Sequence, residues 1–213
     1  MVRYEDDQLE ETRTLLRHDG LDQLLSVFQQ GVYHLTSVQG YFGIKSDGYI
    51  RPNDGSFPDT YPQSAISYGR DRGYVSLFDF ESPTEIQILQ QYWKWEGFIF
   101  RHKPATILIG FDRQKLASEL IYYKQATEEA GVKPMKIPHL EVWYPKPISF
   151  RWATQFVLIT SQRSVEFEVF EVERETSKRL KPLLKIARAL DAQNGAESKL
   201  QKFLRSKRRE EHP

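Results

Sequence analysis

The clearest helical pattern lies near the N-terminal end of the chain. Apolar residues recur there at the i, i+3, i+4, i+7 spacing of one helix face, in Leu21, Leu24, Leu25 and Phe28. Asp19-Gly20 precedes this segment and Gly31 follows it, which matches helix start and stop signals. We therefore predict that residues 1–31 form a helical segment that packs on the rest of the protein.

Short apolar and aromatic runs after residue 31 predict a series of strands. These runs cover residues 32–35, 49–52, 73–80, 105–111, 140–144, 156–160 and 165–172. The 105–111 run is apolar throughout, as in a strand buried on both faces. In the last run Val165, Phe167 and Val169 alternate with Glu166 and Glu168, which is typical of a half-exposed antiparallel strand.

Capping residues place helices between these strands. Thr36 or Ser37 can cap a brief helix that ends at a glycine, and Pro83 can open another at its first turn. Asp112 can cap a third helix, which we expect to continue to about residue 124. Leucines at helical spacing predict a further helix over 180–190.

The order of these elements favours an α+β fold. It shows no regular βαβ rhythm, so we expect a split, mostly antiparallel sheet flanked by helices. Because no Pro/Gly/Ser-rich linker interrupts the chain, residues 32–195 are predicted to form one domain. Residues 196–213 follow as a polar, basic tail with six Lys and Arg against three Glu.

Composition narrows the classes of function. The chain has no cysteine, which excludes disulfides, thiolate nucleophiles and iron–sulfur centres. Its five histidines are scattered without helical metal-ligand spacing, so no metal is expected. The 30 basic and 29 acidic residues nearly cancel, so the net charge does not indicate a nucleic-acid or membrane partner. The acidic N-terminus predicts no signal peptide, and we expect a cytoplasmic protein.

One segment stands out as a candidate ligand site. A lone histidine on a strand is most often a core or surface residue, but here Tyr33-His34-Leu35-Thr36 is followed by Phe42-Gly43-Ile44 and by Asp47-Gly48-Tyr49-Ile50. This unit resembles the first motif of the ADP-ribosyltransferase superfamily. The best local likeness is to the DarT-like toxins, which modify nucleic acid, and it spans roughly residues 32–160.

The resemblance continues in two later blocks. Ser64-Ala65-Ile66-Ser67-Tyr68 is followed by Arg70 and Arg72, and then by the segment 74–80. Leu140-Glu141-Val142-Trp143-Tyr144 resembles the strand that carries the family's catalytic glutamate. The family usually has an asparagine shortly after the motif threonine, at a place where this chain has Gln39-Gly40.

The resemblance implies that NAD is the co-substrate. The residues expected to bind it are His34, Leu35, Thr36, Tyr68 and Tyr74. Catalysis is expected to depend on Glu141 and on Arg70 or Arg72. Cleavage of the nicotinamide–ribose bond leaves an oxocarbenium-like sugar, and nicotinamide departs as a neutral molecule, so the main requirement is one carboxylate that stabilises the sugar cation.

The implied acceptor is a nucleic-acid base of DNA or RNA, in a single strand or flipped out of a duplex. Lys146, Arg151 and Trp152 are candidates to hold the strand, together with the aromatic and basic clusters 92–95 and 101–103. The resemblance further implies a toxin or phage-defence effector, which an antitoxin protein could bind.

Other interpretations remain open at this point. The acceptor could be a protein side chain, or the chain could be a nucleic-acid- or nucleotide-binding module of the same fold without catalysis. A reaction like that of RNA 2′-phosphotransferases would depend on His and Arg in place of Glu. Residue by residue, Glu141 could be an ordinary exposed strand residue, and Tyr68 and Tyr74 could be core aromatics.

Overall fold

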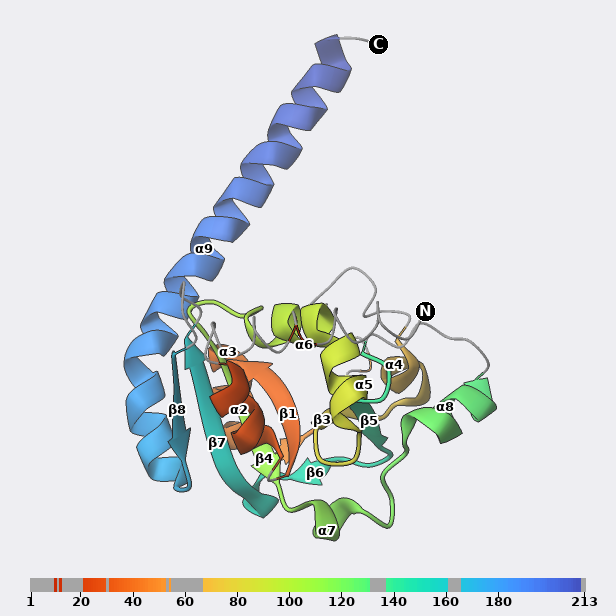
Figure 1. The fold of residues 1–213 in the computed structure, drawn as a ribbon. Helices are drawn as coiled ribbons and strands as arrows, with labels where there is room; N and C mark the ends of the chain where they lie inside the picture. The colour runs from red at the N-terminus through yellow and green to blue at the C-terminus, as the bar shows by residue number, and fades with distance from the viewer. Residues whose placement is uncertain are drawn as a thin grey trace.

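The computed structural model describes residues 10, 12, 21–29, 31–52, 54, 67–130, 137–160 and 166–211, and for 195–211 it describes the backbone alone. The described residues form a mixed α/β structure in which helices flank an antiparallel sheet (Figure 1). This agrees with the expected α+β class. Ser64-Ala65-Ile66 and most of residues 1–20 lie outside the described residues.

The central sheet has six described strands in the order β5-β3-β1-β4-β7-β8, and every neighbouring pair is antiparallel. The strands are β1 (Val32–Ser37), β3 (Val75–Asp79), β4 (Ala105–Phe111), β5 (Glu141–Tyr144), β7 (Ala153–Thr160) and β8 (Glu166–Phe170). A separate two-stranded ribbon pairs β2 (Tyr49–Ile50) with β6 (Ile148–Ser149).

Helices cover both faces of the sheet. They are α2 (Leu21–Phe28), α3 (Val38–Asp47), α4 (Tyr68–Arg72), α5 (Glu85–Gln90), α6 (Tyr92–Ile99), α7 (Arg113–Leu116), α8 (Tyr123–Ala130) and α9 (Glu173–Glu211), with a 3-10 turn at Phe150–Trp152. The residues of α3, α7, α9 and the ribbon share one core with one side of the sheet, which we call the α9 face. The residues of α2, α5 and α6 share a second core on the α6 face.

Strand β4 contributes to both of the larger cores, one on each face of the sheet. All seven of its residues are buried, as the uninterrupted apolar run predicts. Ile107 and Ile109 belong to the core on the α9 face, and Leu108 belongs to the core on the α6 face. Alternate side chains of one strand therefore hold the two layers of helices against the sheet.

The predicted caps at Ser37 and Asp112 are confirmed, but the prediction that Pro83 opens a helix at its first turn is wrong, because Thr84 is the N-cap of α5 and Pro83 precedes it. Ser37 caps α3 by accepting a hydrogen bond from Gly40 N–H, and Gly48 ends that helix in the left-handed region at φ 76°. Asp112 caps α7, but this helix ends at Leu116, and the prediction of one helix to residue 124 is wrong. The reason is tertiary, because Ile121 leaves the helical path to pair with Trp143 of β5.

The longest helix, α9, packs on the body only through its first part. Arg179 makes an ion pair with Glu168 of β8 at 2.6 Å, and Gln39 of α3 donates to Asp191 at 2.6 Å. The far end of the helix projects away from the body (Figure 1). The helix continues through residue 196, where the sequence predicted a tail. Within the described chain, no helix combines the length and the apolar character that crossing a membrane requires.

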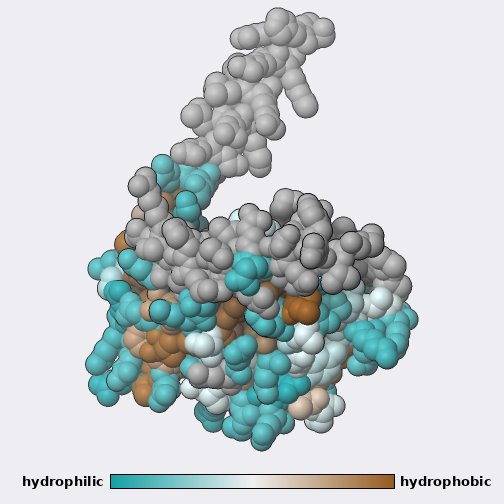
Figure 2. All heavy atoms as spheres, in the orientation of Figure 1, coloured by the Kyte–Doolittle hydropathy of each residue, from teal (hydrophilic) through white to brown (hydrophobic). Residues whose placement is uncertain are grey.

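The edge strand β8 leaves apolar side chains at the surface. Val169 is 39 % exposed, and Val172 just after the strand is 51 % exposed. Apolar side chains gather over β8 and α2 on the left side of Figure 2. Glu166 and Glu168 are exposed on the same strand, and charged side chains on an edge strand disfavour pairing with another chain.

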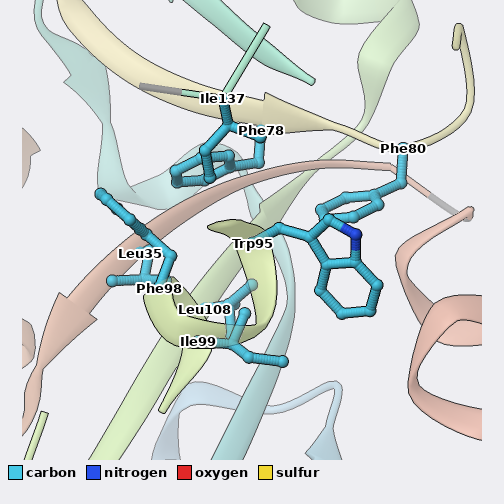
Figure 3. Close-up of a pocket in the computed structure, with 8 residues that line it drawn as sticks. All are labelled: Leu35, Phe78, Phe80, Trp95, Phe98, Ile99, Leu108 and Ile137. Atoms are coloured by element: carbon cyan, nitrogen blue, oxygen red, sulfur yellow. The ribbon is translucent and has the colours of Figure 1, made fainter. Parts of the chain in front are cut away.

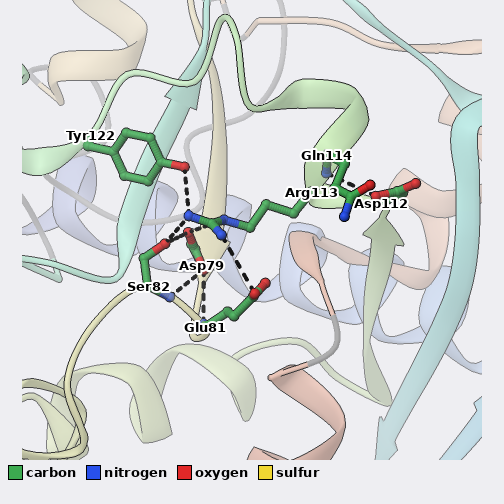
Figure 4. A network of polar contacts seen from close by, with 7 residues as sticks. All are labelled: Asp79, Glu81, Ser82, Asp112, Arg113, Gln114 and Tyr122. Atoms are coloured by element: carbon green, nitrogen blue, oxygen red, sulfur yellow. Dashed lines mark hydrogen bonds and ion pairs between the residues drawn. The ribbon is translucent and has the colours of Figure 1, made fainter.

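A polar network closes the end of β3 on the α9 face (Figure 4). The Asp79 side chain is fully buried, and its Oδ1 accepts hydrogen bonds from the backbone N–H groups of Glu81 and Ser82, at 2.9 and 3.1 Å. Arg113 Nε lies 3.3 Å from Asp79 Oδ2, and Arg113 Nη2 donates to Ser82 Oγ at 2.6 Å and to Tyr122 Oη at 3.3 Å. One buried carboxylate thus orders the β3–α5 turn and ties α7 to it.

We expect Asp79→Ala to lower the free energy of unfolding by about 3 kcal/mol, because it removes the buried partner of Arg113 and the acceptor of two backbone N–H groups. Asp112→Ala is the matched control. It removes a cap from α7, where Asp112 Oδ1 accepts from Gln114 N–H at 2.9 Å, and should cost about 1 kcal/mol. Urea unfolding of both variants measures the difference, and equal costs would show that the Asp79 network adds nothing beyond a cap.

Candidate active site

The candidate site begins where β1 separates from β3. Six residues of β1 pair with β4, but the registered pairing of β1 with β3 stops after Val32–Asp79 and Tyr33–Phe78. The next residue of β1 is His34. Its Nδ1 lies 3.1 Å from the backbone oxygen of Ser76 in β3, so a side chain makes the contact between the two strands at this point.

The hydrogen bond to Ser76 determines which ring nitrogen of His34 carries the proton. A carbonyl oxygen only accepts, so Nδ1 must donate to it. Burial lowers the pKa of His34 from 6.5 to about 4, and the hydrogen bond with Ser76 opposes that shift. The ring is therefore neutral at physiological pH, and its Nε2 carries a lone pair that can accept a hydrogen bond from a hydroxyl group.

A second histidine lies close to His34 in the turn after α6. Burial lowers the pKa of His102 to about 4, and the charges of Arg101 and His34 add to this effect. The backbone N–H of His102 donates to the buried Thr106 hydroxyl at 3.3 Å. Both imidazoles are thus neutral at physiological pH.

Glu141 is held two strands away from β1. Tyr33 pairs with Phe78, and Phe78 pairs with Glu141, so these three residues form one row across β1, β3 and β5. Two strand spacings put the Cα atoms of Tyr33 and Glu141 about 10 Å apart. Glu141 is only 6 % exposed and faces the same side of the sheet as Phe78, so the interpretation of an ordinary exposed strand residue is wrong.

An aromatic cluster lies beyond Glu141 on the same face. Trp143 pairs with Ser76, and its ring centroid is 4.8 Å from that of Tyr68 in α4. Tyr68 also contacts Tyr74 at 6.0 Å, and its hydroxyl donates to Glu129 of α8 at 2.9 Å. Tyr68 is 1 % exposed and Tyr74 is half-buried, so Tyr68 is a core residue and Tyr74 is the more accessible ring.

Helix α4 brings the two candidate arginines to this cluster in different ways. The guanidinium carbon of Arg72 lies 5.9 Å from the centre of the Tyr68 ring, in cation–π geometry. Arg70 is half-buried. Residues two apart on a helix point about 200° from each other, so the two arginines cannot both face the cluster. The contact between Arg72 and the Tyr68 ring puts Arg72 on the side of the aromatic rings.

A glycine allows α4 to approach the sheet this closely. A Cβ atom at Gly69 would lie 2.7 Å from Trp143 Cδ1 and 2.8 Å from Ser76 Oγ. The indole Nε1 of Trp143 would be 2.9 Å away, and this buried group has no hydrogen-bond partner among the described residues. The backbone of α4 thus covers the edge of Trp143, and residue 69 has no room for a side chain.

The Thr36 hydroxyl lies close to the backbone of a second glycine, Gly40 of α3. A Cβ atom at Gly40 of α3 would lie 2.1 Å from Thr36 Oγ1, and Thr36 is only 9 % exposed. Gln39 points to α9, where it binds Asp191. The family pattern has an asparagine at this place. Here the Gln39 side chain instead binds α9, and Gly40 leaves room for the Thr36 hydroxyl.

Leu35 lies apart from these polar groups, in an apolar hollow under α6. The hollow is lined by Leu35, Phe78, Phe80, Trp95, Phe98, Ile99, Leu108 and Ile137, whose side chains point toward one another in Figure 3. Every lining residue is apolar or aromatic, and the Trp95 indole N–H donates to Ile88 O at 3.0 Å. A site for a dinucleotide needs polar groups, so we interpret this hollow as the packed floor beside Glu141.

The three residues proposed to bind nucleic acid lie on the other side of the molecule. Lys146 makes an ion pair with Glu119 at 2.5 Å, and Glu119 also accepts from Tyr144 on the α9 face. Arg151 and Trp152 belong to the 3-10 turn after β6, next to Phe150, which packs on the same core. The structure does not bring these residues to the face on which Glu141 lies.

Sequence reasoning missed several residues that shape this region. Ser76 contributes a backbone oxygen, which no side-chain motif reports. Gly69 and Trp143 matter through packing, and the Asp79–Arg113 pair joins residues 34 positions apart. Among the described residues, no three His, Asp or Glu side chains gather as metal ligands. No family model, curated protein or solved structure matches this chain.

Two glycines of the same helix test the fit of Thr36. Gly43→Ala adds a Cβ atom with nothing within 4 Å, so it should stabilise the protein by about 0.5–1 kcal/mol through helix propensity. We expect Gly40→Ala to lose this gain and to destabilise, because the Thr36 hydroxyl must move, at a cost of about 1–3 kcal/mol. Urea unfolding compares the two variants, and equal stabilisation would contradict the close contact.

The neutral His34 predicts how stability depends on pH. The unfolded state protonates this residue near pH 6.5 and the folded state only near pH 4, so stability should fall as the pH falls between these values. His34→Asn replaces the ring N–H donor by an amide N–H donor that does not titrate. It should reduce the loss of stability between pH 7 and pH 5 by on the order of 1 kcal/mol.

Denaturant unfolding at both pH values measures this effect. His102→Asn should act in the same direction, because the pKa of His102 is lowered in the same way. A pH slope that both replacements leave unchanged would contradict the neutral, buried state of the two rings.

Proposed function

We propose that this chain is an NAD-dependent ADP-ribosyltransferase that transfers ADP-ribose to a nucleic-acid base. The observation that carries the proposal is the row Tyr33–Phe78–Glu141, which holds the buried Glu141 carboxylate two strands from the residue that precedes His34. The histidine and the glutamate are the two residues for which the motif resemblance implies a role. Tyr33, which precedes His34, lies two strand spacings from Glu141, so the two residues come from neighbouring parts of one sheet.

The chemistry of His34 suits a role in binding. A neutral imidazole whose Nδ1 donates to a backbone carbonyl offers Nε2 as an acceptor for a ribose hydroxyl. The backbone contact also orients the ring, since Ser76 belongs to a paired strand. In the proposal His34 and Thr36 hold the NAD ribose, Tyr74 borders the nicotinamide, and Arg72 compensates the pyrophosphate charge.

The chemistry of Glu141 suits a role in the reaction. The bond between nicotinamide and C1′ of the ribose breaks, the electron pair leaves with neutral nicotinamide, and C1′ becomes electron-poor. A base nitrogen of the acceptor attacks C1′ and releases one proton. A buried carboxylate stabilises the positive sugar more strongly than an exposed one and can accept that proton.

The fold is compatible with the proposal in its general features. An antiparallel sheet whose β1–β3 pairing stops after two residue pairs, with helices on both faces, is compatible with the split sheet that the resemblance implies. With this activity we propose the biological setting of a toxin or phage-defence effector, in which a partner protein would neutralise the enzyme. Transfer to a protein and binding without catalysis are outcomes of the same experiment.

We expect Glu141→Gln to reduce transfer of labelled ADP-ribose by at least about a hundredfold while NAD still binds, because a charge that acts in the transition state is removed. The measurement incubates labelled NAD with separate pools of DNA, RNA and protein, and calorimetry measures NAD binding. Glu166→Gln is the matched control, since it changes an exposed glutamate of strand β8 and should leave transfer intact.

The outcomes separate the alternatives. Label that protease removes and nuclease does not would assign a protein acceptor. Binding of oligonucleotides without binding of NAD would favour a module without catalysis. Full activity of Glu141→Gln would exclude the glutamate mechanism and would favour a phosphotransferase-like reaction that depends on His and Arg.

A further inference from the structure

Helix α6 has one outer face that its packing does not use. Tyr92 and Trp95 are buried, at 2 % and 1 % exposure, but Trp93 is 68 % exposed. This is the largest exposed fraction among the large hydrophobic side chains of the described residues. Exposure of a whole indole ring costs free energy in water, so such a ring on a helix surface often marks a contact site.

The Tyr92 ring packs edge-on against Trp93 with 4.8 Å between the ring centroids, and the side toward Gly97 is open among the described residues. Residue 97 lies one turn further along the helix on the same side, and it is a glycine. A Cβ atom built at Gly97 meets nothing within 4 Å. The neighbouring position therefore places no side chain against the indole, and a flat group can approach its face.

The segment that carries this ring is basic. Residues 92–103 contain Lys94, Arg101 and Lys103 against one carboxylate, Glu96, so this segment has a net charge of +2 with its histidine neutral, whereas the whole chain has +1. Lys94 Nζ donates to the uncharged side-chain amide of Gln91 at 2.9 Å. The Arg101 guanidinium lies 5.7 Å from the centre of the Phe98 ring.

The inner side of the same helix reaches the candidate active site. The Phe98 ring centroid is 5.2 Å from that of Phe78, and Phe78 is the strand partner of Glu141. His102, just after the helix, is close enough to His34 for a charge on His34 to lower the pKa of His102. A molecule bound on the outer face of α6 is therefore one helix away from the Glu141 row.

We propose that the outer face of α6 binds single-stranded nucleic acid, with one base stacked on Trp93 and the phosphates held by Lys94 and Lys103. The inference rests on the proposed function, because it identifies how the acceptor strand is held beside Glu141. An exposed aromatic ring on a basic segment is the combination that unpaired strands require. A duplex keeps its base faces stacked and offers only its phosphates to this surface.

The test measures binding of a fluorescein-labelled oligonucleotide to the full chain by anisotropy, with DNA and RNA of one sequence, each single-stranded and duplex. Trp93→Ala should weaken single-strand binding on the order of tenfold, and Trp93→Phe should restore much of it, because a phenyl ring still stacks. Trp152→Ala is the matched control, since Trp152 is 41 % exposed on the opposite side of the sheet and should leave binding unchanged.

A second variant tests the phosphate contacts. Lys103→Gln should reduce the slope of log K against log salt for single strands by about 0.7, the value for one lost phosphate contact. These measurements contain no NAD, and calorimetric NAD binding by Trp93→Ala should equal that of the unchanged chain. Failure of the acceptor surface is thereby distinguished from failure of the proposed activity, which Glu141→Gln reports.

Three results would overturn the proposal. One is oligonucleotide binding that Trp93→Ala leaves intact, and another is equal weakening by Trp152→Ala. The third is a change of sedimentation from dimer to monomer in Trp93→Ala without a change in oligonucleotide binding, which would assign this face to contact with a second copy of the chain.

Discussion

The backbone of β1 must satisfy its hydrogen bonds on two sides, and it does so unequally. On one side β4 pairs with the whole strand, but on the other side the pairing with β3 ends at Tyr33 and Phe78. A carbonyl left without a strand partner needs another donor, and for Ser76 that donor is the His34 ring. The position and the tautomer of this histidine follow from that one requirement, whereas its neutral state follows from burial.

Contacts on both faces of β3 fix this strand where it separates from β1. On the α9 face, Asp79 and Arg113 fix the C-terminal end of β3, and Asp79 N–H donates to Leu140 O at 2.8 Å, next to Glu141. On the α6 face, Phe78 and Trp143 are covered by α6 and α4. The Asp79–Arg113 ion pair on one face and the aromatic packing on the other keep β3 and β5 in register next to Glu141.

Much of the local structure could be predicted from the sequence, because it depends on neighbouring residues. The apolar run of β4, the cap at Ser37 and the stop at Gly48 act within a few positions of one another. The helix after Asp112 shows the limit of such reasoning. Its cap is local, but its end depends on Ile121 pairing with a strand that comes twenty residues later.

The sequence by itself determined the elements, the α+β class and the motif around His34, because periodicity, caps and residue types are properties of short segments. Only the tertiary structure decided that Glu141 is buried, that Gln39 binds α9, and that Lys146 and Trp152 lie away from the Glu141 face. It also decided that Trp93 is exposed although its neighbours Tyr92 and Trp95 are buried. The reason is that strand order, register and helix packing join residues far apart in the chain, and burial and charge are consequences of that pairing.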